Sequence, residues 1–165
     1  NVLQGQPVGV TQAALPKPAG VPTQVSGSIS AELLKKTGLQ NYAFLSTPYT
    51  GKLLDRIDFP GVSGVLSFES YLKKNDIVQM AGFYEFDASS AVSANEVYDL
   101  IKLKCTAEVG AILNETNSFG DASFYVNYYE IPDKVFVVFR KGLKIFAFSY
   151  NKELHGAAVK LMGLL

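Results

Sequence analysis

Residues 135–150, VFVVFRKGLKIFAFSY, decide the architecture of this chain. They predict two strands that are joined by a turn at Lys141–Gly142. Successive side chains of a strand point to opposite faces, and in VFVVF both sets are apolar. A strand with one face in water would instead alternate apolar with polar residues. We therefore expect both faces of this sheet to be covered.

The helices expected downstream of residue 93 and residue 151 can shield one face of that sheet. Cover for the other face must come from the segment before Val65 or from a neighbouring chain. At roughly 25 cal/mol per Å2, several exposed aromatic side chains would cost several kcal/mol and favour aggregation. We expect the N-terminal third of the chain, or a partner, to pack there.

The remaining elements follow from local signals. Residues 65–72 and 77–86 predict a hairpin through the turn at 73–76, and residues 122–131 predict a further strand. Ser30 is a predicted N-cap of a short helix that stops at Gly38. Ser93 and Glu96 form a predicted capping box for a longer helix, whose apolar stripe runs through Cys105, Val109 and Ile112 to about residue 113. Asn151 is expected to cap the last helix.

These elements predict an α+β fold. It is a two-layer sandwich in which two main helices cover one face of an antiparallel sheet of about five or six strands. At 165 residues the chain has the length of one domain. We assign residues 28–165 to that domain and residues 1–27 to an extended N-terminal tail rich in Pro, Gly and Gln.

The tail carries a single charged side chain, Lys17, and has Pro at positions 7, 16, 18 and 22, which excludes a regular helix. Residues 8–14 are compatible with a short extended segment, which could form a strand only beside another strand. The apolar tail residues are candidate assembly contacts: Val2, Leu3, Val8 and Val10.

Composition excludes one class of partner and favours another. The chain has 15 Lys and Arg against 15 Asp and Glu, and no segment has the basic stripe that nucleic acid attracts. Charged residues make up 18%, below the roughly 25% that is typical of soluble domains, and 48% of the residues are hydrophobic. We expect some of this apolar surface to meet a protein, either another copy of the chain or another surface protein.

Several features bear on the compartment. The chain begins with Asn, which we interpret as a processed chain that has lost a signal peptide, or as a trimmed piece. The uncharged run at 1–16 is broken by Gly, Gln and Pro, so we expect no transmembrane segment. Cys105 is the only cysteine, so no internal disulfide can form. Asn114, in the sequon Asn-Glu-Thr, is a candidate glycosylation site on a secreted chain.

No catalytic or cofactor motif stands out, and we expect no metal or cofactor. Cys105 falls on the apolar stripe of its helix, which favours a buried thiol over a nucleophile. His155, the only histidine, has no catalytic sequence context. Asp55 with Asp58, and Glu85 with Asp87, are candidate carboxylate pairs, although solvated charges are the simpler interpretation. The same holds for the aromatic run at 124–129, where tyrosines on a sheet can bind glycans but core packing is simpler.

Two functional hypotheses follow. In the first, the chain is a non-catalytic, secreted structural subunit of a cell-surface or extracellular assembly, and its tail lies along the sheet edge of a neighbour. In the second, it is a monomeric extracytoplasmic binding or accessory domain, and its tail is a flexible tether. An enzyme that uses scattered Asp, Glu and Tyr residues and an intracellular regulator are further alternatives.

Overall fold

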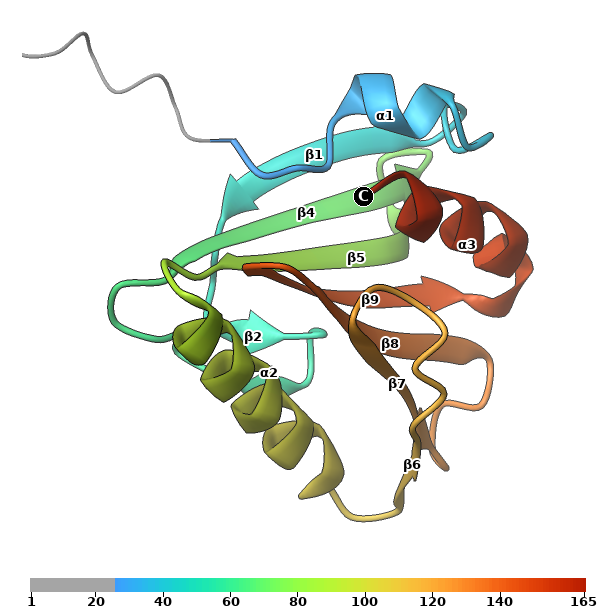
Figure 1. Cartoon of the computed structure of the whole chain (residues 1–165). Helices are drawn as coiled ribbons and strands as arrows, with labels where there is room; N and C mark the ends of the chain where they lie inside the picture. The colour runs from blue at the N-terminus through green and yellow to red at the C-terminus, as the bar shows by residue number, and fades with distance from the viewer. Residues whose placement is uncertain (1–25) are drawn as a thin grey trace, which may run out of the picture.

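The computed structural model describes residues 26–165, so the tail residues Val2, Leu3, Val8 and Val10 lie outside the described part of the chain. The fold is α+β, with a large antiparallel sheet and three helices in the described part (Figure 1). The helices are α1 (Ala31–Lys35), α2 (Ala91–Thr106) and α3 (His155–Leu164), the last preceded by a 3-10 turn at Lys152–Leu154. The strands are β1 (Ala43–Pro48), β2 (Lys52–Leu53), β3 (Ile57–Asp58), β4 (Leu66–Lys74), β5 (Val78–Asp87), β6 (Ala111–Asn114), β7 (Ala122–Tyr128), β8 (Lys134–Lys141) and β9 (Lys144–Asn151).

Seven of these strands form one antiparallel sheet in the order β1-β4-β5-β9-β8-β7-β6. The expected meander of β7, β8 and β9 and the expected hairpin of β4 and β5 are both present. The two groups are joined where β5 pairs with β9, for example at Phe83 opposite Phe148. The sheet is therefore larger than the five or six strands expected, because β1 and β6 extend it at its two edges.

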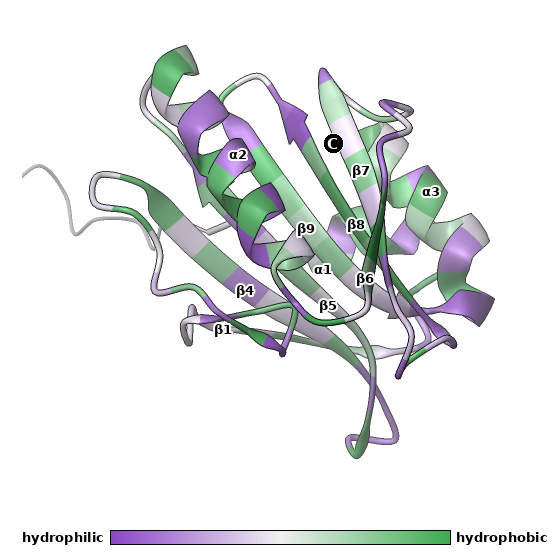
Figure 2. Cartoon of the chain, turned by 90° about the horizontal axis from the view of Figure 1, so that it is seen from below, coloured by the Kyte–Doolittle hydropathy of each residue, from purple (hydrophilic) through white to green (hydrophobic). Residues whose placement is uncertain are grey.

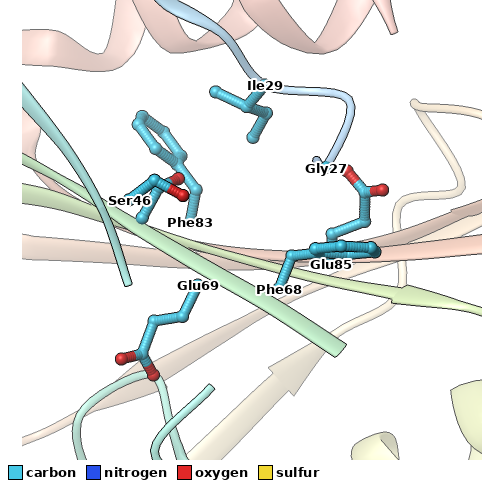
Figure 3. A pocket seen from close by; sticks show the side chains of 8 residues that line it. Gly27, Ile29, Ser46, Phe68, Glu69, Phe83 and Glu85 are labelled. Atoms are coloured by element: carbon cyan, nitrogen blue, oxygen red, sulfur yellow. The ribbon is translucent and has the colours of Figure 1, made fainter. Parts of the chain in front are cut away.

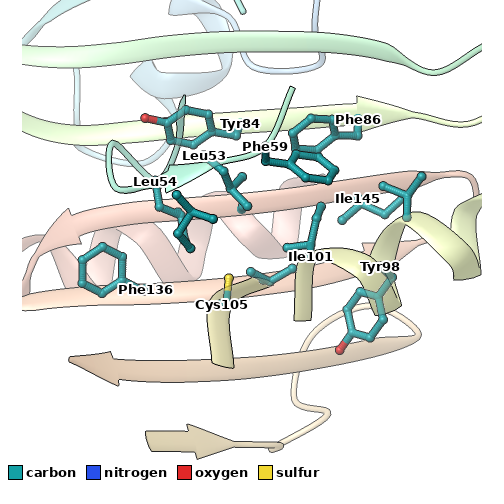
Figure 4. Packing of buried hydrophobic residues seen from close by; sticks show 14 of the residues in the cluster. Leu53, Leu54, Phe59, Tyr84, Phe86, Tyr98, Ile101, Cys105, Phe136 and Ile145 are labelled. Carbon is teal, nitrogen blue, oxygen red and sulfur yellow. The ribbon is translucent and has the colours of Figure 1, made fainter. Parts of the chain in front are cut away.

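Both faces of the sheet are covered, as the apolar strands predicted. Phe136 and Val138 of β8 lie in one buried cluster, and Val137 and Phe139 lie in another on the opposite face. All four side chains are at most 1% exposed. Figure 4 shows part of the first cluster, in which Ile101 and Cys105 of α2 face the sheet.

The expectation that two main helices share one face is wrong. Buried residues of α2 pack with the β2–β3 hairpin on one face, whereas α1 and α3 pack on the other. Figure 1 shows α2 at the lower left of the sheet, with α1 and α3 at the top and right. In Figure 2, which views the molecule from below, α2 lies in front of the sheet. The segment before Val65 supplies cover to both faces, through Leu53 and Phe59 on one and Ile29 and Leu34 on the other.

The predicted long helix is shorter than expected. It is capped by Ser90, whose Oγ accepts a hydrogen bond from the Ser93 backbone N–H at 3.1 Å, so Ser93 lies inside the first turn. It ends at Thr106, and Gly110 then takes a φ of 77°, which only glycine adopts easily. Residues 111–113, expected at the end of the helix, and Asn114, expected in the loop after it, pair with β7 as strand β6.

The two other helix starts differ from each other. Ser30 caps α1 as predicted, since its Oγ accepts from the Leu33 backbone N–H at 3.2 Å. Asn151 makes no side-chain cap, because it is the last residue of β9 and its amide contacts Met80 Sδ instead. None of the helices over residues 26–165 has the length and apolar character that crossing a bilayer would require.

Candidate interaction surface

Strand β6 is an edge of the large sheet. It pairs on one side with β7, in a register that places Ala111 opposite Tyr128 and Asn114 opposite Tyr125. On its other side no strand follows within the described part of the chain. The backbone N–H and C=O groups on that side are free to pair with an added strand.

Exposed apolar side chains surround this edge. Val109 is 100% exposed, Ile112 64% and Tyr129 89%. Leu103 and Leu113 are exposed as well. Tyr129 Cβ lies 3.8 Å from the position that a Cβ on Gly110 would occupy, so the turn before β6 and the end of β7 are neighbours. We call four of these residues the edge surface: Val109, Ile112, Leu113 and Tyr129.

The opposite edge of the sheet has a different character. Strand β1 ends in Pro48 and exposes Ser46 and Thr47. Proline on an edge strand opposes pairing with another chain, because it donates no hydrogen bond. Strand β6, with the sequence AILN, has no proline and no charged residue. Strand β1 also lacks charge and exposes Leu45, so the difference between the two edges is the proline that β6 lacks.

Two adjoining hollows lie beside β6 on the face that carries α3. One, of about 700 Å3, is lined by Ile112, Asn127, Tyr128, Tyr129, Glu130, Pro132 and Lys152. The other, of about 530 Å3, is lined by Asn114, Thr116, Tyr125, Asn127, Val135, Lys152 and His155. Asn127 and Lys152 line both, so the two hollows form one open groove along the sheet.

Asn114, the candidate glycosylation residue, is the last residue of β6 and is exposed. It lines the second hollow, and Glu115 beside it forms an ion pair with Lys102 of α2. Its position on the surface is compatible with modification.

The aromatic run divides between the two faces of the sheet. Phe124 and Tyr128 are buried in the cluster beneath α2, so for them the core-packing interpretation is correct. Tyr125 is half-buried on the opposite face, and Tyr129 belongs to the edge surface. Tyr125 and Tyr129 expose enough of their rings for a ligand or partner to contact them.

The tail joins the domain through a buried acidic cluster. Glu85 of β5 accepts a hydrogen bond from the backbone N–H of Ser28 at 2.7 Å and one from the Ser28 hydroxyl at 3.2 Å. Lys144 of β9 donates to Ser28 Oγ at 2.7 Å and forms ion pairs with Glu85 at 3.5 Å and Asp87 at 3.4 Å. Figure 3 shows Glu85 beside Gly27 and Phe68. The first described residues are therefore fixed to β4 and β5.

Gly27 has a steric role in this attachment. A Cβ added there would lie 3.2 Å from Cβ of Phe68, closer than most side chains tolerate. The space that Gly27, Phe68, Glu69 and Glu85 line is only about 10 Å3, about enough for one water molecule. The cluster holds the start of the described chain against β4 and β5.

Burial, and after it the neighbouring Asp87, raise the pKa of Glu85 to about 7, even though the Ser28 N–H and Lys144 act to lower it. Oδ1 of Asp87 is buried and has no hydrogen-bond partner among the described residues. A protonated Glu85 carboxyl would supply a hydrogen-bond donor for Asp87. The interpretation of Glu85 and Asp87 as solvated charges is therefore wrong, because Ser28, Lys144 and the sheet enclose Glu85.

The other candidate carboxylates have separate partners. Asp55 accepts from Tyr84 OH at 2.8 Å, and Asp58 pairs with Lys52 at 2.6 Å. Glu69, which the sequence did not single out, is buried and accepts from Thr47 at 3.2 Å and Thr50 at 3.0 Å. The alternation of side chains along β4 places Glu69 on a covered face. Its threonine partners come from β1 and the loop after β1, so the local sequence of β4 does not reveal them.

Cys105 and His155 are held in structural contacts. Cys105 is fully buried on α2, and burial raises its thiol pKa to about 12, so little thiolate forms near neutral pH. His155 Nδ1 lies 2.8 Å from Tyr150 OH, and the two rings stack with centroids 5.9 Å apart. Within residues 26–165, no three His, Cys, Asp or Glu side chains lie close enough to share a metal ion.

Comparison with protein-family models, with curated proteins and with solved structures found no match to this chain. The function proposed below therefore rests on the edge surface, the groove and the buried cluster.

Proposed function

We propose that this chain is a non-catalytic, secreted structural subunit of an extracellular or cell-surface assembly, and that its N-terminal tail contacts a neighbouring subunit. The observation that carries the proposal is the unprotected edge strand β6, flanked by the exposed side chains of Val109, Ile112 and Tyr129. Large exposed apolar side chains beside a free strand edge favour association between chains.

The buried carboxylates support a non-catalytic role. Glu85 lines a space of only about 10 Å3, where its partners are Ser28 and Lys144, whereas Glu69 is buried on the opposite face and accepts hydrogen bonds from Thr47 and Thr50 (Figure 3). A general acid or base must reach a substrate proton directly or through one water molecule. Neither carboxylate opens onto a hollow in which a substrate fits.

The alternative is a monomeric extracytoplasmic binding domain on a flexible tether. The groove beside β6 favours it, because the groove combines the half-buried Tyr125 ring with the amide of Asn127 and the ammonium of Lys152. Such a combination suits a polar ligand, including a glycan. In this alternative the chain acts alone and the edge surface has no partner.

Light scattering after size exclusion separates the two proposals. The full chain is compared with a chain that lacks residues 1–25, so that the attachment of Gly27 and Ser28 stays intact. Assembly predicts a concentration-dependent oligomer for the full chain and a monomer for the shortened chain. Monomers in both would refute the assembly proposal and favour the tethered domain.

A further inference from the structure

We propose that residues 8–14 of one copy, VGVTQAA, add as a strand to β6 of the next copy. This inference rests on the proposed assembly function and names its acceptor site. In strand addition the main-chain hydrogen bonds provide affinity, and pockets for alternate side chains provide specificity. Strand β6 and its surroundings offer both.

The acceptor is the less protected of the two sheet edges. Its backbone has no described partner beyond β7, and AILN contains neither proline nor charge. Edge β1 exposes Ser46 and Thr47 and ends in Pro48. An added strand is therefore accommodated better at β6 than at β1.

The side chains of the tail segment match the two sides of β6. Val8 and Val10 have one parity, whereas Gly9, Thr11 and Ala13 have the other. On one face, the hollow of about 700 Å3 beside Ile112 and Tyr129 has room for the valines. On the other face lies α2, where Lys102 pairs with Glu115, and Gly9, Thr11 and Ala13 would face it.

The attachment of the tail sets how far residues 8–14 can reach. Ser28 is fixed to Glu85 of β5, and three strands separate β5 from β6, which is about 20 Å of sheet at roughly 4.8 Å per strand. Residues 15–25 contain three prolines and, if extended, would span about 34 Å at roughly 3.1 Å per residue, enough to reach β6 of the same copy or of a neighbour; the proposed assembly function selects the neighbour. Donor and acceptor lie at different places on the molecule, so contact between copies is head-to-tail and extends into an open chain.

The first experiment compares four chains by light scattering over a concentration series: the full chain, the chain without residues 1–25, Ile112→Lys and Ile77→Lys. Ile77 is the matched control, since it is 83% exposed but lies beside the β4–β5 turn. The full chain and Ile77→Lys should form oligomers larger than dimers. The shortened chain should be monomeric, and Ile112→Lys should weaken association about tenfold or more, because a charge on the edge opposes pairing. Tyr129→Lys is a second acceptor variant, whose side chain is too exposed to affect folding.

A second experiment isolates the contact. A labelled peptide of residues 1–25 is titrated with the shortened chain and with its Ile112→Lys and Ile77→Lys versions. Binding should weaken about tenfold or more only for Ile112→Lys. A peptide with Val8→Asp and Val10→Asp should lose binding, whereas Gln4→Asp with Gln6→Asp, which adds the same charge at the same parity, should retain it.

Each outcome supports or refutes a named proposal. A monomeric full chain refutes the assembly function and this inference together. Oligomers that need the tail but tolerate Ile112→Lys and Tyr129→Lys refute the acceptor site alone. Dimers that persist without the tail but are lost in Ile112→Lys indicate that two β6 strands pair with each other, which also refutes the inference. A monomer whose tail becomes protease-sensitive only in Ile112→Lys indicates that the tail docks on its own domain, and this too refutes the inference.

Discussion

Glu85 accepts a hydrogen bond from the backbone N–H of Ser28 at 2.7 Å, although the two residues are 57 positions apart in the chain. This contact, with Lys144, fixes the start of the described chain to the middle of the large sheet. It gives the tail a defined origin, about 20 Å of sheet away from edge strand β6.

Glu85 should make stability depend on pH. Its pKa is about 7 in the folded protein against an ordinary 4.5, so the folded state holds a proton that the unfolded state has released. Stability should therefore fall as pH rises from about 4.5 to about 7 and then level off, by an amount on the order of 2–3 kcal/mol. Glu85→Gln cannot ionise and should not show this loss, so at about pH 8 it should be more stable than the wild type.

Urea unfolding at a series of pH values measures this effect. The difference between wild type and Glu85→Gln isolates the one carboxyl from all other titrating groups. Glu32→Gln is the matched control, because that side chain is 82% exposed on α1. Parallel pH profiles for the wild type and Glu85→Gln would contradict the prediction.

Arg56 should stabilise the β2–β3 hairpin against the end of α2. Its guanidinium carbon lies 4.1 Å from the centroid of the Tyr128 ring, and the side chain pairs with Glu108 at 3.2 Å. Arg56→Ala should lower the free energy of unfolding by about 1–2 kcal/mol in urea. Lys52→Ala, which breaks an exposed pair with Asp58, should have a much smaller effect. Equal costs would mean that the ring contact adds nothing.

Cys105 should be unreactive in the folded protein. It is fully buried and its thiol pKa is raised by burial to about 12, so at about pH 8 it presents almost no accessible thiolate. A chromogenic disulfide reagent should react slowly with the native chain and rapidly after addition of denaturant. Rapid reaction under native conditions would indicate that α2 opens readily or that the thiol is accessible.

Asn114 should accept a glycan when the chain passes through a eukaryotic secretory pathway. The residue is exposed at the end of β6, and the sequon continues into the exposed residues Glu115 and Thr116. Mass spectrometry should detect a mass increase that a glycosidase removes. Asn114→Gln and Thr116→Ala should both abolish it, and a secreted wild-type chain without the added mass would refute the prediction.

Several features were predictable because their signals are local. The uninterrupted apolar run of residues 135–139 indicated burial on two faces, and Val137 and Val138 are indeed buried in opposite clusters. Ser30 signalled a helix start because an N-cap needs only its own first turn. The hairpin at Asn75 and Asp76 formed as expected, since both residues tolerate the positive φ of 54° and 57° found there.

Strand β6 was missed because a helix and a strand competed for the same residues. Val109 and Ile112 continue the helical spacing that passes through Cys105, so the local pattern extended α2 too far. Pairing of Ile112 with Asn127 across the chain decided otherwise. The edge surface was therefore outside the reach of local periodicity, although each of its apolar residues was visible in the sequence.

The sequence by itself determined that this chain builds an antiparallel sheet with two apolar faces, because side-chain alternation within a strand fixes which residues point which way. Only the tertiary structure decided which helix covers which face, since an apolar stripe on α2 or α3 fits either one. It also decided that Glu85 is buried beside Ser28 and Lys144, because these residues meet only after distant strands have paired.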